Sequence, residues 1–267
     1  MSENRTLVMG ILNLTPDSFA DGGRHNTFEL ALARVHEMIS QGVDIIDVGG
    51  ESTRPGAERV SPEEEIERVI PIIAEIRELG AVSSIDTMRA STAAAAIAAG
   101  VTYVNDVSGG LADPEMAKLI ARNSEIQYIA MHWRGHSADM QSRAIYADVV
   151  KEVKNELEER AELLIKSGIE PERLILDPGL GFAKSAKHNW ELLRNIDRLA
   201  FLGFPLLIGA SRKSFLGELL GGVTPDERES ASVAITTEMA RQGVWGVRTH
   251  SVKPHRDAID VVEELGA

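Results

Sequence analysis

The chain has 267 residues, a net charge of −13, 43% hydrophobic residues and no cysteine. The hydrophobic fraction is ordinary for a globular protein and suffices for one large core. The acidic balance argues against nucleic acid or an anionic membrane as a partner, although a few basic side chains in one cleft would still hold a small anion. Without cysteine the chain has no disulfides, which fits a reducing compartment. Since we find neither a signal-peptide pattern nor an apolar run of the roughly 20 residues that cross a membrane, we expect a cytoplasmic protein.

Eight short apolar segments, each followed by a longer segment with helical periodicity, are expected to form strands. Their runs of β-branched and aliphatic residues are typical of strands that are buried on both faces of a parallel sheet. The expected strands are Leu7–Leu12, Asp44–Val48, Val82–Asp86, Tyr103–Asp106, Ile126–Met131, Leu174–Asp177, Leu206–Gly209 and Trp245–Thr249.

The segments between these strands carry helix start signals. Ser61, Pro62 and Glu64 have the types and spacing of an N-cap and of the first and third helical residues, and Thr224 begins a second such pattern. Eight strand–helix units in about 250 residues favour a closed (β/α)8 barrel, or TIM barrel. A doubly wound open sheet is the alternative. We expect residues 1–267 to form a single barrel domain with its active site at the C-terminal ends of the strands.

Polar residues follow the ends of nearly all the expected strands. Because the carboxyl ends of barrel strands meet at one face, we expect these residues to converge there. A single aspartate in such a place often only caps the next helix, and Asp106 before Ser108 can be explained in that way. The repetition along the chain favours an active site, built from residues that include Asn13, Thr53, Arg54, Asp86, Asn105, Asp177, Lys213, Arg248 and His250.

One group of these residues predicts an anion-binding subsite. Arg248 and His250 are two apart on an expected strand, so both side chains should point to one face. With donors from Asn13, Thr53 and Arg54 they suit a phosphate or a pyrophosphate. Arg54 taken alone is equally well explained as a solvated loop charge. The side-chain oxygen of Asn13 is a candidate ligand for a Mg²⁺ ion that bridges phosphates.

A second group suits a flat heterocycle with hydrogen-bonding edges. Asp86, Asn105, Asp177 and Lys213 would present donors and acceptors inside the barrel mouth. The Asp177 carboxylate can accept two parallel N–H bonds from an amino-pyrimidinone edge, and Lys213 can donate to its carbonyl. The alternative is an internal ion pair between Asp177 and Lys213. The two histidines of segment 132–136 lack a clear third metal ligand, so we expect this segment to line the site or form a lid.

The motifs, taken together and in order, match one known family. The chain resembles the dihydropteroate synthases of folate biosynthesis, and its segment Met131–Arg134 resembles the actinobacterial branch. The matching blocks span almost the whole chain and are Met9–Asn13, Thr15–Phe19, Gly50–Gly56, Ser84–Thr87, Asn105–Gly109, Asp177–Phe182, Ser211–Ser214 and Arg248–His250.

The resemblance implies a reaction and a set of residue roles. Members of the family join 6-hydroxymethyl-7,8-dihydropterin pyrophosphate to 4-aminobenzoate, which gives 7,8-dihydropteroate and pyrophosphate. The implied ligands are Asp86, Asn105, Asp177 and Lys213 for the pterin, Asn13, Thr53, Arg54, Arg248 and His250 for pyrophosphate, and Phe19, Pro55, Phe182 and Ser214 for 4-aminobenzoate. Catalysis would depend on Asp86, Lys213, Arg248 and His250, with Mg²⁺ bound at Asn13. The resemblance also implies a homodimer that is a target of sulfonamides.

The chain departs from the family pattern at three positions, where Ala20, Thr249 and Ser251 replace the common serine, valine and aspartate. None of these is a residue assigned to chemistry. The departures leave open a paralogue with a drifted substrate. Two rival functions are also considered. A pterin-binding methyltransferase domain would lack pyrophosphate residues such as Asn13 and Arg248. A catalytically silent paralogue would show gaps in the loops after the first two strands.

Overall fold

The computed structural model describes residues 5–15, 24–51, 60–135 and 140–266 of the chain. Each expected strand is present, and each strand end lies within one residue of the expected position. The strands are β1 (Leu7–Asn13), β2 (Ile45–Gly49), β3 (Ser83–Asp86), β4 (Tyr103–Asp106), β5 (Gln127–Met131), β6 (Leu174–Asp177), β7 (Leu207–Ile208) and β8 (Gly246–Thr249).

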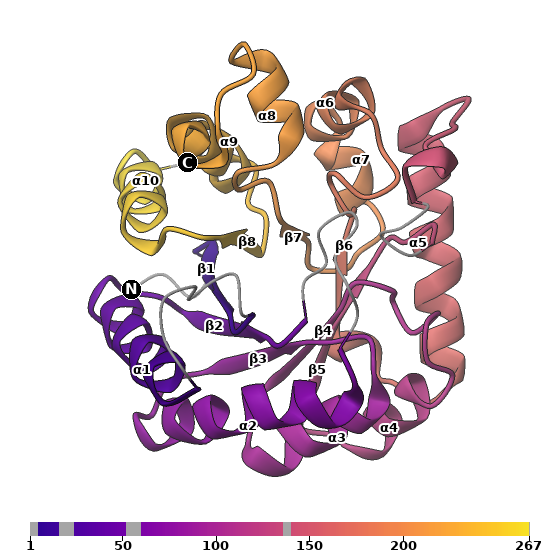
Figure 1. Cartoon of the computed structure of the whole chain (residues 1–267). Coiled ribbons are helices and arrows are strands. Elements are labelled where there is room, and N and C mark those ends of the chain that lie inside the picture. Colours follow the sequence, from indigo (N-terminus) through magenta and orange to yellow (C-terminus); the bar gives the residue numbers. More distant parts are fainter. Residues whose placement is uncertain (1–4, 16–23, 52–59, 136–139, 267) are drawn as a thin grey trace.

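The eight strands form one parallel sheet in the order β6-β5-β4-β3-β2-β1-β8-β7 (Figure 1). Its two outer strands approach each other, because the backbone nitrogen of Leu176 donates to the carbonyl oxygen of Pro205 at 2.9 Å. Leu176 and Leu206 also form an isolated parallel bridge. The sheet is therefore nearly closed, and the predicted (β/α)8 barrel is confirmed rather than the open sheet.

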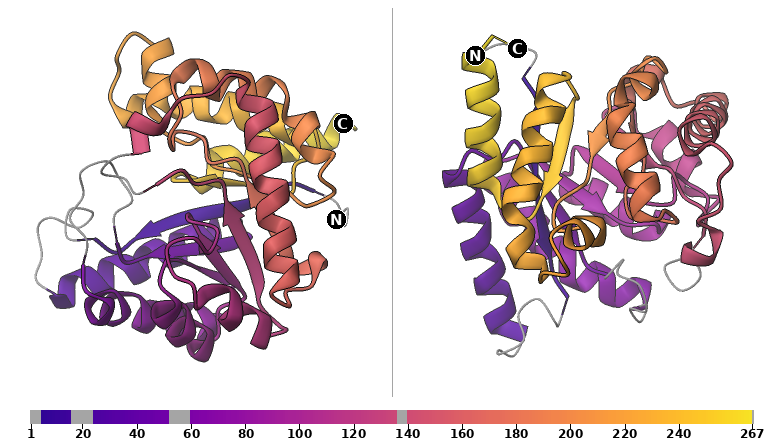
Figure 2. Two further views of the ribbon diagram at one scale, coloured as in Figure 1. Left: turned by 90° about the vertical axis from the view of Figure 1, so that its right-hand side faces the viewer. Right: turned by 90° about the horizontal axis from the view of Figure 1, so that it is seen from above.

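Helices cover the outside of the barrel (Figure 2). Among the described residues, two connections hold more than one α-helix, since α6 and α7 lie between β6 and β7, and α8 and α9 lie between β7 and β8. The helices are α1 (Arg24–Ser40), α2 (Pro62–Glu78), α3 (Ala90–Ala99), α4 (Met116–Arg122), α5 (Val149–Lys166), α6 (Ala186–Arg194), α7 (Ile196–Ala200), α8 (Ser214–Leu219), α9 (Glu229–Arg241) and α10 (Val252–Glu264). The short 3-10 helices are η2 (Met140–Arg143), η3 (Pro171–Arg173) and η4 (Pro225–Arg228).

The two helix start signals in the sequence, at Ser61 and Thr224, both form N-terminal caps, but only the first directly begins an α-helix. Ser61 is the N-cap of α2 and accepts a hydrogen bond from the backbone nitrogen of Glu64 at 3.1 Å. Thr224 forms a capping box with Glu227, but the element that it begins is η4, and α9 follows only after it. The local motif therefore predicts the cap, while the surroundings decide how the helix continues.

The barrel interior changes from apolar to polar along the strands. Its apolar part is a small cluster formed by Met9, Ile45, Ile129, Ile175 and Leu207. Side chains two residues further along a strand point to the same face, so Asp47 and Asp177 follow Ile45 and Ile175 inside the barrel. A larger apolar cluster lies between the strands and the helices. The barrel thus places carboxylates at the C-terminal end of its interior.

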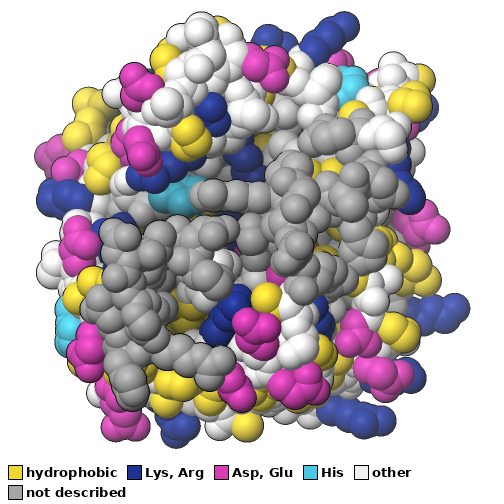
Figure 3. Space-filling model, viewed as in Figure 1, with side chains coloured by type: hydrophobic (Ala, Val, Ile, Leu, Met, Phe, Trp, Pro, Cys, Tyr) yellow, Lys and Arg dark blue, Asp and Glu magenta, His cyan; other side chains and the backbone are white. Residues whose placement is uncertain are grey.

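The surface carries charges of both signs. On the face shown in Figure 3, acidic and basic side chains are interspersed around the rim. Basic groups are therefore present on this face despite the negative net charge of the chain. Within the ranges given above, no helix is both long enough and apolar enough to cross a membrane.

Candidate active site at the C-terminal ends of the strands

Side chains from β2, β3 and β4 form a hydrogen-bonded group with Arg248 of β8 inside the barrel. Arg248 donates from Nε to Oδ2 of Asp47 at 2.6 Å and from Nη2 to Oδ2 of Asp86 at 2.7 Å. The same oxygen of Asp47 accepts a hydrogen bond from Nδ2 of Asn105 at 3.0 Å. Asp86 and Asn105 are register partners on β3 and β4, which brings them to one level of the barrel. The structure thus brings together three of the predicted site residues.

Burial and neighbouring charges set the ionisation of this group. Burial raises the pKa of Asp86 to about 7; the Arg248 guanidinium acts against this rise, and the charge of Asp47 adds to it. Burial also disfavours the charged form of Arg248, but Asp47 and Asp86 more than compensate, so the pKa of Arg248 lies above its ordinary value. At neutral pH the arginine is therefore a fixed cation, whereas Asp86 is close to the midpoint of its titration.

Asp47 is a site residue that sequence reasoning did not identify. Its side chain is fully buried, and among the described residues its Oδ1 atom has no hydrogen-bond partner. In the sequence it stands inside the apolar segment Ile45–Val48, which predicts a strand. The signal in the sequence that could have identified Asp47 is its charge, because an aspartate in a fully buried strand needs a partner or a function.

Asp177 and Lys213 lie at the barrel mouth without forming the ion pair that the sequence left open. Oδ1 of Asp177 accepts a hydrogen bond from the backbone nitrogen of Gly179 at 2.7 Å. Nζ of Lys213 lies 4.3 Å from the ring centre of Phe182, a cation–π contact, and Ser214 lies exposed at the start of α8. Burial lowers the pKa of Lys213 to about 8 and raises that of Asp177. Both groups keep hydrogen-bonding capacity that a ligand can use.

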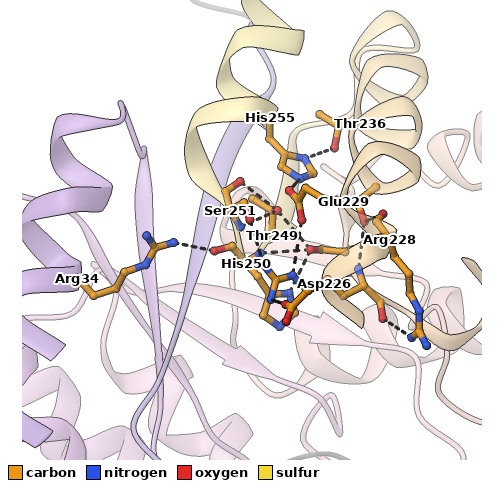
Figure 4. A network of polar contacts seen from close by, with 12 residues as sticks. Arg34, Asp226, Arg228, Glu229, Thr236, Thr249, His250, Ser251 and His255 are labelled. Carbon is orange, nitrogen blue, oxygen red and sulfur yellow. Dashed lines mark hydrogen bonds and ion pairs between the residues drawn. The ribbon is translucent and has the colours of Figure 1, made fainter. Parts of the chain in front are cut away.

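His250 lies one residue beyond the end of β8, between α1 and the loop after β7 (Figure 4). Its Nδ1 atom is 3.1 Å from Oγ of Ser211, and its carbonyl oxygen accepts a hydrogen bond from Arg34 at 2.8 Å. Ser251 is the N-cap residue of α10, but its side chain makes no capping bond. Its hydroxyl instead accepts a hydrogen bond from Arg212 at 3.3 Å. The side chains of His250 and Ser251 therefore have different partners, although Thr249 links Ser211 to Ser251 through hydrogen bonds within one polar network (Figure 4).

Asn13, the last residue of β1, is a candidate magnesium ligand at this end of the barrel. A Cβ atom on Gly49 would lie 3.4 Å from Oδ1 of Asn13 and 3.8 Å from Oδ2 of Asp86, so the glycine keeps the space beside these oxygens open. In the described part of the chain, no cluster of three or more His, Cys, Asp or Glu residues could hold a metal ion. Mg²⁺ commonly uses only one or two protein oxygens and completes its shell with water and substrate phosphates. A single amide oxygen at the mouth fits that donor set.

Four predicted site residues lie outside the described residues, and these are Phe19, Thr53, Arg54 and Pro55. The structure does describe the residues on either side of positions 52–59. Arg89 donates to Oε2 of Glu51 at 2.6 Å and to the carbonyl oxygen of Val60 at 2.8 Å. The backbone nitrogen of Val60 also donates to Glu51 at 3.1 Å. Arg89 thus joins the two flanking residues next to the C-terminal end of β2.

His132, the residue that follows β5, lies in a buried hydrogen-bonded cluster and, with Trp133, lines a small cavity beside α5. His132 is buried, and its ring nitrogens lie 3.0 Å from Nζ of Lys184 and 2.9 Å from Oε2 of Glu156. Lys184 is also buried and is a second residue that sequence reasoning missed. Nothing local distinguishes it from a surface lysine, since its acceptors are supplied by the fold.

Comparisons with known proteins identify the family. Residues 9–250 match the family model described as pterin binding enzyme. The chain is 46% identical over 261 residues to the dihydropteroate synthase of Mycobacterium leprae, a match that covers 96% of this chain and 92% of the relative. It matches the Xanthomonas albilineans dihydropteroate synthase with 4-aminobenzoic acid at a TM-score of 0.92 and 41% identity, over 99% and 94% of the two chains. It matches the Yersinia pestis dihydropteroate synthase with a sulfonamide drug complex at a TM-score of 0.92 and 37% identity, over 100% and 96%. The chain therefore belongs to the pterin-binding enzymes and, within them, to the dihydropteroate synthases, which are transferases.

Proposed function

We propose that the residues around Arg248 carry out the dihydropteroate synthase reaction of this family. In that reaction the methylene carbon of the pterin substrate exchanges its bond to pyrophosphate for a bond to the nitrogen of 4-aminobenzoate. The observation that carries the assignment of roles is the contact of Arg248 with two buried carboxylates, Asp47 and Asp86, at 2.6 and 2.7 Å. A fixed cation and a carboxylate near its titration midpoint are thereby held side by side at the barrel mouth.

The pterin ring binds between the side chains of the barrel interior. The carboxylate of Asp177 accepts N–H bonds from the amino-pyrimidinone edge, and Lys213 donates to the ring carbonyl. Asn105 supports the opposite edge, since its amide is oriented by the 3.0 Å bond to Asp47. Asp47 acts through Asn105 and Arg248 and is a positioning residue.

Bond breaking separates charge, and the described residues stabilise both products. When the carbon–oxygen bond breaks, both electrons leave with pyrophosphate, and Arg248 and His250 stabilise this anion. The remaining cation is delocalised over the pterin, and the carboxylate of Asp86 stabilises it at short range. The neutral amine of 4-aminobenzoate then attacks the carbon and loses one proton from nitrogen.

Mg²⁺ is the cofactor that this assignment includes, with Asn13 as its protein ligand. When bound, the ion would neutralise charge on the pyrophosphate oxygens. In our proposal, Thr53 and Arg54 complete the pyrophosphate subsite. Both residues lie outside the part of the chain that the structure describes. Arg248 and His250 act on the same anion from the barrel side.

The 4-aminobenzoate pocket is assigned to Phe182 and Ser214, together with Phe19 and Pro55. The Xanthomonas albilineans relative was solved with 4-aminobenzoic acid and the Yersinia pestis relative with a sulfonamide drug, which supports sulfonamide binding in the same pocket. From the family alone we also propose that residues 1–267 form one domain, that the chain works in the cytoplasm and that it assembles as a homodimer.

The test measures pyrophosphate release and dihydropteroate formation from the pterin substrate, with and without 4-aminobenzoate and Mg²⁺. We expect dihydropteroate only when both additions are present, with one pyrophosphate released for each dihydropteroate formed. Arg248→Met should lower turnover about 10²- to 10³-fold, the usual loss for one group that stabilises a developing anion. Arg241→Met, an exposed arginine on α9, is the matched control and should retain the parent rate. No dihydropteroate in the presence of both additions, or equal rates for the two variants, would contradict the assignment.

A further inference from the structure

A buried lysine that the proposed reaction does not use lies behind the loop after β6. The side chain of Lys184 is 3% exposed. Its Nζ atom lies 3.1 Å from the carbonyl oxygen of Gly179, 3.0 Å from that of Phe182 and 3.0 Å from Nδ1 of His132. An ammonium group has three N–H donors, and here each of them has one acceptor. The geometry therefore suits the charged form of the lysine.

The third acceptor requires one state of the histidine. Nδ1 of His132 can accept a hydrogen bond from Lys184 only if the ring is neutral and its proton is on Nε2. Nε2 then donates to Oε2 of Glu156, which lies 2.9 Å away. Burial and, after it, the charge of Lys184 lower the pKa of His132 to about 4, so the neutral ring is the stable one.

The far end of this chain of contacts is fixed to α5. Glu156 is a residue of α5, and its Oε2 atom also accepts a hydrogen bond from Nε of Arg134 at 3.0 Å. Arg134 in turn donates to Glu152 at 2.9 Å and lies 3.9 Å from the ring centre of Tyr146. Lys184 is thus connected through His132 and Glu156 to a helix on the outside of the barrel.

On its other side, Lys184 bonds to the loop after β6, which contacts or contains residues assigned to the pterin and to 4-aminobenzoate. Gly179, whose carbonyl accepts from Lys184, donates its own N–H to Asp177 at 2.7 Å. Phe182, whose carbonyl also accepts from Lys184, packs its ring 4.3 Å from Nζ of Lys213. A Cβ atom on Gly179 would lie only 2.6 Å from the carbonyl oxygen of His132, so the loop is pressed against β5.

We propose that Lys184 is a positioning residue for both substrates, whose three hydrogen bonds fix the loop 179–182 and with it Asp177 and Phe182. The inference rests on the proposed function, since it concerns the same two subsites. Lys184 also acts through its charge, because it lies among the groups that lower the pKa of Asp177, while Asp177 raises that of Lys184. Burial acts against this and lowers the pKa of Lys184 to about 7.

The first experiment compares Lys184→Met and Lys184→Gln with Lys187→Met. Lys187 is an exposed lysine on α6 and serves as the matched control. We expect both Lys184 variants to weaken pterin binding in calorimetry and to raise the KM for 4-aminobenzoate, each roughly 10-fold or more, since hydrogen bonds of a charged group are lost. Binding of inorganic pyrophosphate should stay at the parent value, because Arg248 is held by Asp47 and Asp86 and His250 contacts Ser211. A folded Lys184 variant with pterin affinity within about twofold of the parent overturns the proposal.

A chemical rescue separates a positioning charge from a general packing role. In Lys184→Ala, propylammonium should restore part of the pterin affinity, whereas propan-1-ol of similar size should not. Equal effects of the two compounds, or no effect of the amine, overturn the requirement for the charge. Parent enzyme that forms no dihydropteroate would instead contradict the proposed function, so the two failures are distinguishable.

Discussion

Replacing Asp47 with asparagine tests how far the site depends on a second buried carboxylate. Oδ2 of Asp47 accepts hydrogen bonds from Arg248 at 2.6 Å and from Asn105 at 3.0 Å. An amide oxygen in the same place keeps both bonds, and the amide nitrogen takes the place of Oδ1, which has no partner among the described residues. The substitution therefore removes the charge and keeps the shape.

The expected loss of stability is moderate. Asp47→Asn should lower the free energy of unfolding by about 1–2 kcal/mol, because Arg248 keeps a neutral acceptor in place of a charged one. Asp47→Ala leaves both donors without their acceptor in a buried place and should cost about 3–5 kcal/mol. The asparagine costs less because burying a carboxylate is itself unfavourable, and that penalty disappears with the charge.

The pKa of Asp86 gives a second readout of the same substitution. Burial raises this pKa to about 7, Arg248 lowers it and the negative charge of Asp47 raises it again. Loss of the charge at Asp47 removes one of the raising contributions, so the pKa of Asp86 falls. The proposed mechanism uses Asp86 as a carboxylate, which is the form present above its pKa. The acid limb of the rate–pH profile should therefore move to lower pH in Asp47→Asn.

The assays are urea unfolding at a pH above the titration of Asp86 and kcat/KM for the pterin substrate across the acid limb. Asp44→Asn is the matched control, because Asp44 lies just before β2, far from Asp86 along the strand, and pairs with Arg256 at 2.9 Å. It should lower stability and leave the acid limb in place. An acid limb that stays fixed or moves to higher pH in Asp47→Asn would refute the reasoning.

Three further outcomes are expected. Lys213→Ala should weaken pterin binding by on the order of 2–5 kcal/mol, because a donor is lost beside a buried carboxylate, and unchanged calorimetric titrations would rule out this subsite. Ser251→Asp should leave turnover nearly unchanged, since the Ser251 hydroxyl contacts Arg212. His250→Ala should lower turnover about 10²-fold. Equal losses of turnover in parallel assays would mean that the pyrophosphate site is misplaced. Arg173→Met should lower the free energy of unfolding by about 2–4 kcal/mol in urea melts, because its Nη1 atom donates to three backbone carbonyls, and an unchanged midpoint would contradict this.

The sequence by itself determined the order of the elements and the residues at the strand ends. Apolar runs such as Leu174–Asp177 mark buried strands, and the signal is local, so the predicted bounds agree with β6. The cap of α2 at Ser61 is likewise a contact between residues three apart, which a motif can express. In a parallel barrel the carboxyl ends of all strands lie at one face. The sequence order alone therefore predicts that Asp86, Asn105 and Arg248 lie close together.

Only the tertiary structure decided which side chains contact one another. Arg248 and Asp47 are 201 residues apart in the chain, and nothing near either residue specifies the other. Lys184 looks like a surface lysine in the sequence, and it is buried because His132, 52 positions before it, and the carbonyls of the loop after β6 supply its acceptors. The absence of an ion pair between Asp177 and Lys213 has the same origin, since Phe182 takes the place beside the ammonium group. Partner choice in a buried site depends on distances between strands, and closure of the barrel sets those distances.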